Sequence, residues 1–252
     1  MSDLDFTVRG ESGPALLLVH GFPLDRRIWA SVTPKLPASI RLILPDLRGH
    51  GKSALPPGPC TIEDYARDLL GLMDKLSIPK FFIAGHSMAG YILFAIHRIA
   101  PDRIAGGALV SSRALADTDD GKKTREATAQ RAEREGAAFL AGTMPDKAVG
   151  NAPPPGVLDT LRTVIRGAQG KGVAAASRAM ASRPDATPQL SKIAFPTVVF
   201  AGRGDKIVPP AESEAMAQAI PGAKLVWCEK SGHVPMLEEP DLVATELAAL
   251  VK

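Results

Sequence analysis

Residues 85–90, GHSMAG, follow the short apolar run FFIA and precede a second apolar run, so that Ser87 lies two residues beyond FFIAG. A serine on a sharp turn between a strand and a helix exposes its hydroxyl to substrate and to a neighbouring base. Because that hydroxyl is a weak nucleophile at neutral pH, it works only when such a base is close. Ser87 is therefore a candidate nucleophile, and the alternative is a small residue that simply fits a tight turn.

The chain contains five histidines, and one of them is well placed to be that base. His86 is adjacent to the serine, and neighbours on a tight turn point apart, while His97 falls within a helical pattern. His20 and His50 lie in glycine-containing turns that they are expected to hold by hydrogen bonds. His233, in SGHVPMLEEP, lies between a predicted strand and the last predicted helix. Its position late in the chain fits the third place of a Ser…Asp…His order.

The acid that orients such a histidine should lie between the two. Asp205, in GRGDKIVP, follows the apolar run TVVFAG, and the glycines of this loop allow the carboxylate to project over the sheet edge. Glu238 and Glu239 are nearer to His233 in sequence. They are expected to open the last helix, where acidic side chains suit the helix dipole. Asp205 is thus the predicted acid.

A serine, a histidine and an aspartate in these roles carry out acyl transfer, in which the serine attacks a carbonyl carbon. The oxyanion that forms on the carbonyl oxygen needs backbone N–H donors. One donor is expected from Met88, the residue after the serine, and the other from Phe22, in the loop HGFPLDRRIW. Gly21 allows that loop to approach the substrate oxygen closely.

The elements that must position these residues alternate along the chain. Buried strands are predicted at 15–19, 41–45, 81–85, 106–112, 197–202 and 223–229, and 4–10 offers one more. Helical patterns occupy 26–36, 62–77, 88–100, 210–220 and 241–251. Continuous apolar runs separated by helices predict an α/β fold with a mostly parallel, doubly wound sheet. In such sheets ligands bind at the carboxyl ends of the strands, which is where each candidate residue lies.

Residues 113–189 break this rhythm because they contain no convincing strand. Their periodic apolar positions predict an ordered helical insertion, which we call the cap, between a core made of residues 1–112 and 190–252. Several apolar cap residues could either line a substrate pocket or pack the cap onto the sheet, and the sequence leaves both readings open. They are Phe139, Leu140, Met144, Leu161, Val164 and Ile165.

Composition excludes several classes of protein. The 252 residues suit one α/β domain, and a net charge of +3 offers no strongly basic face, so no nucleic-acid partner is expected. No apolar stretch approaches the roughly 20 residues of a membrane-spanning helix, and the acidic N-terminal segment is unlike a signal peptide. A cytoplasmic protein without membrane association is expected. Cys60 and Cys228 show no metal or redox spacing, and reduced thiols are favoured over a disulfide.

Five blocks together resemble one family, the α/β-hydrolase superfamily, and in particular its small cytoplasmic carboxylesterases and 3-oxoadipate enol-lactonases with a helical cap. The blocks are HGF, DLRGHGKS, GHSMAG, GRGDKIVP and SGHVPMLEEP, in the family's order over nearly the whole chain. The resemblance implies that Ser87 is the nucleophile, His233 the base and Asp205 the acid, with Phe22 and Met88 as oxyanion donors. It also implies that DLRGHGKS is a structural loop and not a nucleotide site.

The predicted triad implies a serine esterase that acts on a small-molecule ester or lactone, and this mechanism needs no metal or organic cofactor. A modest apolar pocket favours short-to-medium acyl chains. Ala89, where the usual motif has glycine, is interpreted as a tolerated variant. Enol-lactone hydrolysis is the alternative within the same chemistry. A receptor that keeps its triad and turns over slowly is the alternative from another class. The oligomeric state and the natural substrate are not readable from the sequence.

Overall fold

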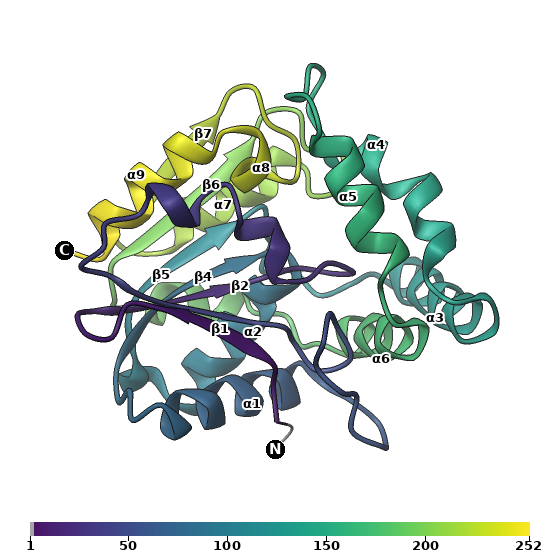
Figure 1. Cartoon of the computed structure of the whole chain (residues 1–252), viewed down its shortest axis with the longest axis horizontal. Helices are drawn as coiled ribbons and strands as arrows, with labels where there is room; N and C mark the ends of the chain where they lie inside the picture. The colour runs from purple at the N-terminus through teal and green to yellow at the C-terminus, as the bar shows by residue number, and fades with distance from the viewer. Residues whose placement is uncertain (1–2) are drawn as a thin grey trace.

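Seven strands form one sheet in the computed structural model, which describes residues 3–252 (Figure 1). The strand order is β1-β3-β2-β4-β5-β6-β7, in which β1 is antiparallel to β3 and the other neighbours are parallel. This arrangement confirms the predicted mostly parallel sheet. The strands are β1 (Phe6–Arg9), β2 (Ala15–Val19), β3 (Arg41–Pro45), β4 (Phe81–His86), β5 (Ile104–Val110), β6 (Thr197–Gly202) and β7 (Lys224–Cys228).

Both faces of the sheet are covered, as the continuous apolar strands require. In β2, Leu17 and Val19 belong to one hydrophobic cluster, whereas Leu16 and Leu18 belong to the other. The first cluster includes residues of α1 (Ile62–Lys75), α2 (Met88–Ile99) and α7 (Pro210–Ala219), and the second includes residues of α9 (Pro240–Leu250). Figure 1 shows α1 and α2 on the opposite side of the sheet from α9. The sheet is therefore doubly wound, as predicted.

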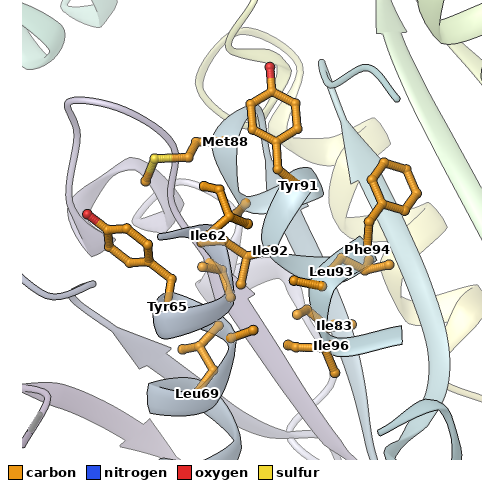
Figure 2. Packing of buried hydrophobic residues seen from close by; sticks show 14 of the residues in the cluster. Ile62, Tyr65, Leu69, Ile83, Met88, Tyr91, Ile92, Leu93, Phe94 and Ile96 are labelled. Atoms are coloured by element: carbon orange, nitrogen blue, oxygen red, sulfur yellow. The ribbon is translucent and has the colours of Figure 1, made fainter. Parts of the chain in front are cut away.

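Helix α2, which begins directly after Ser87, packs firmly against α1 and the sheet. Ile92 and Ile96 of α2 lie beside Ile62 and Leu69 of α1 (Figure 2). A capping box fixes the start of α1: the Thr61 hydroxyl accepts from the backbone N–H of Asp64, and the Asp64 carboxylate accepts from the Thr61 N–H. The helix that follows the serine turn is therefore supported by packing on α1 and on the sheet.

The helix predicted over 26–36 is wrong in kind. Two 3₁₀ helices occupy this stretch, η1 (Arg26–Trp29) and η2 (Thr33–Lys35). Pro34 lies inside the stretch, and proline in a helix interior removes a hydrogen bond and clashes with the preceding turn. The side chains of Ile28 and Trp29 are nevertheless fully buried, which explains the apolar periodicity.

The cap is helical, as expected, and it gathers at one end of the sheet (Figure 1). It contains α3 (Asp119–Glu135), η4 (Ala138–Gly142), α4 (Met144–Ala148), α5 (Val157–Arg166), α6 (Gly170–Ala181) and the start of η5 (Thr187–Lys192). Helix α3 packs on α6 through small side chains, including the buried Ala129 and Ala132. Gln169 donates from Nε2 to the carbonyls of Gly51 and Ser53, so the cap also contacts the DLRGHGKS loop.

The two chain segments that enter and leave the cap are joined by a buried ion cluster. Asp117 accepts from Arg183 at 2.8 Å, from Arg113 at 3.0 Å and from Arg125 at 3.1 Å. The Asp117 and Arg183 side chains are each only 2% exposed. The backbone N–H of Ala186 also donates to the Ala114 carbonyl. Asp117 is thus the common partner that holds the two segments together.

Replacing Asp117 with alanine is expected to lower the free energy of unfolding by about 3–5 kcal/mol, because removing one partner leaves buried guanidinium charge without its counter-ion. Burial raises the pKa of Asp117, but the hydrogen bond from Arg183 and the charge of Arg125 outweigh it and hold that pKa below its usual value. The stabilisation is therefore present at neutral pH and is lost as the pH falls through the lowered pKa. Urea unfolding measures both effects. Asp119→Ala, at a side chain that is 90% exposed, is the control and should change stability by less than about 0.5 kcal/mol.

Three further features bear on function. Within residues 3–252, no helix is long and apolar enough to cross a membrane. The same part of the chain has no group of three or more His, Cys, Asp or Glu side chains that could hold a metal ion. Cys60 and Cys228 are both free cysteines.

Candidate active site

Ser87 lies on a strained turn between β4 and α2. Its backbone angles, φ 50° and ψ −109°, fall in a region that non-glycine residues rarely adopt. Three hydrogen bonds hold this conformation: the Ser87 N–H donates to Val110, and the Ser87 carbonyl accepts from the Ser112 hydroxyl and the Gly90 N–H. Its half-buried position contrasts with the full burial of His86 and Met88. The turn therefore presents the serine side chain at the carboxyl end of β4.

The structure brings Ser87, His233 and Asp205 together. His233 Nε2 lies 2.9 Å from Ser87 Oγ, and His233 Nδ1 lies 2.8 Å from Asp205 Oδ2. Since a carboxylate only accepts, Nδ1 carries the proton and Nε2 is left to accept from the serine hydroxyl. The His233 and Asp205 side chains are each 2% exposed. This is the geometry of a nucleophile, a base and an acid that orients the base.

The loop after β6 fixes the second oxygen of the acid. Asp205 Oδ1 accepts from the backbone N–H groups of Ile207 at 2.8 Å and Val208 at 2.9 Å. These two bonds orient the carboxylate so that Oδ2 faces the imidazole. Ile207 and Val208 thus fix the orientation of the Asp205 carboxylate through their backbone amides and not through their side chains.

The loop after β2 reaches the serine through Gly21. A Cβ atom at Gly21 would lie 2.6 Å from His86 Nδ1 and 3.0 Å from Ser87 Cβ, so only glycine allows this approach. Phe22 follows Gly21, and Met88 opens α2. Among the turn, loop and capping hydrogen bonds of residues 3–252, neither the Phe22 nor the Met88 amide is a donor. The structure therefore places both predicted oxyanion donors in segments that adjoin Ser87.

His20 controls the orientation of the peptide between Gly21 and Phe22. Its Nε2 accepts from the Leu47 N–H at 2.9 Å, which leaves the proton on Nδ1 to be donated to the Gly21 carbonyl at 3.0 Å. The N–H of a trans peptide points opposite to its carbonyl, so holding the Gly21 oxygen also fixes the direction of the Phe22 N–H. The expectation that His20 holds this turn by hydrogen bonds is confirmed.

Burial keeps His20 and its neighbour His50 neutral. It lowers the pKa of His20 to about 4 and that of His50 to about 3, whereas an unfolded chain titrates its histidines near 6.5. Between these values the unfolded chain binds more protons than the folded protein. The free energy of unfolding is therefore highest above about pH 6.5. It falls as the pH drops from there toward the pKa values of the two histidines in the folded protein.

We expect each of the two histidines to cost up to about 1.4 kcal/mol of stability per pH unit over that range. Urea unfolding between pH 7 and pH 4.5 measures the slope. His50→Gln, which keeps a hydrogen-bond donor but cannot titrate, should flatten the slope relative to the unmodified chain. Identical slopes for the two proteins would contradict this assignment.

His86 does not simply point away from the site. Its Nε2 lies 2.8 Å from the backbone carbonyl of His233, to which it donates, and the two rings are 5.0 Å apart between centroids. Burial first, and the neighbouring His233 second, hold the pKa of His86 well below its usual value. A neutral His86 thus supports the backbone of His233.

Glu238 departs from its predicted role. It is the last residue of α8 (Pro235–Glu238) rather than an opening residue of the final helix, and it is 6% exposed. Its carboxylate accepts from the backbone N–H groups of Gly150 and Gly232. Glu239 is the residue that precedes α9. Two adjacent glutamates after His233 were the available signal, but nothing in the sequence distinguishes the buried one from the other.

The candidate pocket residues of the cap divide into two sets. Leu161, Val164 and Ile165 are fully buried in the cluster that includes Ile28 and Trp29, and they pack the cap onto the core. Phe139, Leu140 and Met144 are only half-buried, and Leu140 and Met144 contact both hydrophobic clusters.

Ala89 is accommodated without disturbing the serine turn. Its side chain is fully buried in the cluster formed by α1 and α2. The position that demands glycine is Gly85, where a Cβ atom would lie 2.5 Å from the Ala89 carbonyl oxygen. The alanine therefore adds a buried methyl group to the core.

Comparisons with known proteins agree with this fold. A model of the family described as alpha/beta hydrolase fold matches residues 14–240. A thermophilic esterase from Thermogutta terrifontis, solved with malate bound, is 40% identical over 98% of this chain and 92% of its own, with a TM-score of 0.94. The enol-lactonase from Burkholderia xenovorans LB400 is 30% identical over 99% of this chain and 96% of its own, with a TM-score of 0.91.

One sequence relative is a longer protein. The dihydrolipoyllysine-residue acetyltransferase component of the acetoin cleaving system of Pseudomonas putida is 29% identical over 98% of this chain. The chain spans 66% of that relative's length.

Proposed function

The chain belongs to the α/β-hydrolase fold family, and we propose that it is a serine hydrolase that cleaves small carboxylic esters. The observation that carries this proposal is the chain of contacts from Ser87 Oγ to His233 Nε2 and from His233 Nδ1 to Asp205 Oδ2, at 2.9 and 2.8 Å. The likeness to an esterase at 40% identity supports the same chemistry.

The proposed reaction has two steps. Ser87 Oγ attacks the ester carbonyl carbon while its proton passes to His233 Nε2, and Asp205 stabilises the imidazolium that forms. The amides of Phe22 and Met88 donate to the oxyanion, each contributing about 10²–10³ in rate by comparison with measured cases. The tetrahedral intermediate collapses, and His233 protonates the departing alcohol. Water, deprotonated by His233, then releases the acid from the acyl-enzyme.

The proposed cap is formed by residues 113–189, and the remainder of the chain forms the core. The proposed substrate pocket lies between Ser87 and this cap. Phe139, Leu140 and Met144 are the better lining candidates because they are half-buried, whereas Leu161 and Val164 are committed to packing. A modest apolar surface of this kind suits short-to-medium acyl chains.

Hydrolysis of an enol-lactone is the second candidate, and the likeness to an enol-lactonase at 30% identity favours it. The same nucleophile, base and oxyanion donors would open the ring, since a lactone is an internal ester. A slow-turnover receptor with an intact triad is the candidate from another class, and it would bind a small ester or lactone without releasing product repeatedly.

A panel of p-nitrophenyl esters from acetate to decanoate, with enol-lactones beside it, tests these candidates. Many turnovers per protein molecule on the short chains would support the esterase, and a kcat/KM that is higher for lactones than for every ester would support the lactonase. Less than one turnover on all substrates would overturn both. The chain-length optimum reports the depth of the acyl pocket.

A further inference from the structure

The cap contacts the loop of the proposed base directly. The backbone N–H of His233 donates to the carbonyl of Ala148, at the end of α4, at 2.7 Å. Next to it, a Cβ atom at Gly232 would lie 2.5 Å from the carbonyl carbon of Val149. Cap residues 148–150 therefore lie backbone to backbone against residues 231–233.

A buried carboxylate holds these two segments together. Glu238 Oε1 accepts from the Gly150 N–H at 2.8 Å, and Glu238 Oε2 accepts from the Gly232 N–H at 2.7 Å. The pKa of Glu238 is raised, mainly by burial, and the hydrogen bonds from the two backbone amides partly offset this rise. Because a buried charge is tolerated only when it is hydrogen-bonded, the two backbone N–H groups explain how this acid is accommodated.

The loop of the proposed acid meets the same junction. The Gly204 N–H donates to the Ser231 carbonyl at 2.9 Å. A Cβ atom at Gly204 would lie 3.2 Å from the Gly150 Cα, and one at Gly150 would lie 2.4 Å from the Lys230 carbonyl oxygen. The backbones of the cap, the His233 loop and the Asp205 loop thus lie against one another at Gly150, Gly204 and Gly232.

We propose that Glu238 is a positioning residue that clamps cap residues 148–150 onto residues 231–233 and thereby holds the imidazole of His233 between Ser87 and Asp205. This proposal rests on the proposed function. A carboxylate suits the role because each oxygen accepts from one amide, whereas a glutamine would present its NH₂ group to one of the two N–H donors. Since His233 also donates its own N–H to the cap, a shift of the cap would displace the base.

Glu238→Gln is expected to lower kcat for a p-nitrophenyl ester by about 10–100-fold, because a displacement of about 1 Å costs roughly 10² in rate. KM should change by less than about twofold, because the Glu238 carboxylate accepts from the Gly150 and Gly232 amides and is proposed to act on the position of the base, not on substrate binding. Gly150→Ala, made from the cap side of the same junction, should show the same split between kcat and KM.

Two matched controls accompany these variants. Glu239→Gln alters the neighbouring glutamate, which accepts from Lys230 and Ser231 in the same loop rather than from the cap. Asn151→Ala alters the exposed residue beside Gly150. Both should keep kcat within about threefold of the unmodified chain, because neither removes a hydrogen bond between the cap and the His233 loop, and substitutions away from such contacts have small effects.

A second readout does not depend on hydrolysis. The proton on His233 Nδ1, hydrogen-bonded to Asp205, should give a far-downfield signal in proton NMR of the full chain, and Glu238→Gln should shift or broaden it. An unchanged signal together with unchanged kcat would overturn the positioning role. A changed signal in a chain that hydrolyses no ester would support the role while overturning the proposed function. If Glu238→Gln does not fold, Gly150→Ala decides by the same criteria.

Discussion

Ser87→Ala is expected to reduce kcat on p-nitrophenyl acetate by about 10⁵–10⁶-fold, to the level that the oxyanion donors and binding alone provide. Ser87 Oγ is the atom that lies 2.9 Å from the imidazole Nε2, so its removal takes away the covalent intermediate. Stability should change little, because the side chain is half-buried on a turn held by backbone bonds.

Steady-state hydrolysis and covalent labelling measure this effect together. A fluorophosphonate probe should attach to the peptide that contains Ser87 in the unmodified chain and to none in the variant. Ser177→Ala is a matched control, since it removes a buried hydroxyl that donates to the Arg125 carbonyl within the cap. Equal hydrolysis by the unmodified chain and by Ser87→Ala would rule out this serine as the nucleophile.

Asp205→Asn should lower kcat by about 10⁴-fold near neutral pH. An amide oriented to keep the Ile207 and Val208 bonds at its oxygen would direct its NH₂ group at His233 Nδ1. The imidazole would then carry its proton on Nε2, facing Ser87, and could not accept the serine proton. The wrong tautomer, rather than a lost fold, is the expected cause.

Kinetics at pH 7 to 8, with thermal unfolding alongside, check this prediction. The variant should unfold near the temperature of the unmodified chain while its kcat collapses. Asp241→Asn is the control, because that carboxylate is 84% exposed and pairs only at the surface with Lys35. A loss below tenfold for Asp205→Asn would mean that another group orients His233.

The sequence was most informative where spacing along the chain sets the structure. Apolar runs of strand length predicted the sheet. The positions of Ser87, Asp205 and His233, each just after a predicted strand, predicted which side chains the sheet edge brings together. The stretch 26–36 misled because burial of Ile28 and Trp29 gives the same apolar pattern in 3₁₀ turns as in an α-helix.

Glu238 marks the limit of that reasoning. Its proposed role depends on Gly150, which lies 88 residues earlier in the chain, and on the burial of Glu238 itself, which is 6% exposed. Glutamates that look alike in sequence therefore have different environments. Ser112, whose hydroxyl holds the Ser87 carbonyl, is a second case, since a serine at the end of a strand carries no signal of its own.

The sequence by itself determined the alternation of strands and helices, the family, and the candidate nucleophile, base and acid, because local apolar patterns and turn chemistry depend on near neighbours. Only the tertiary structure decided which of the two glutamates is buried, which cap side chains pack the core, and how the backbone of His233 is held. Those features depend on distant segments that meet at contact distance, and no local pattern records which segments will meet.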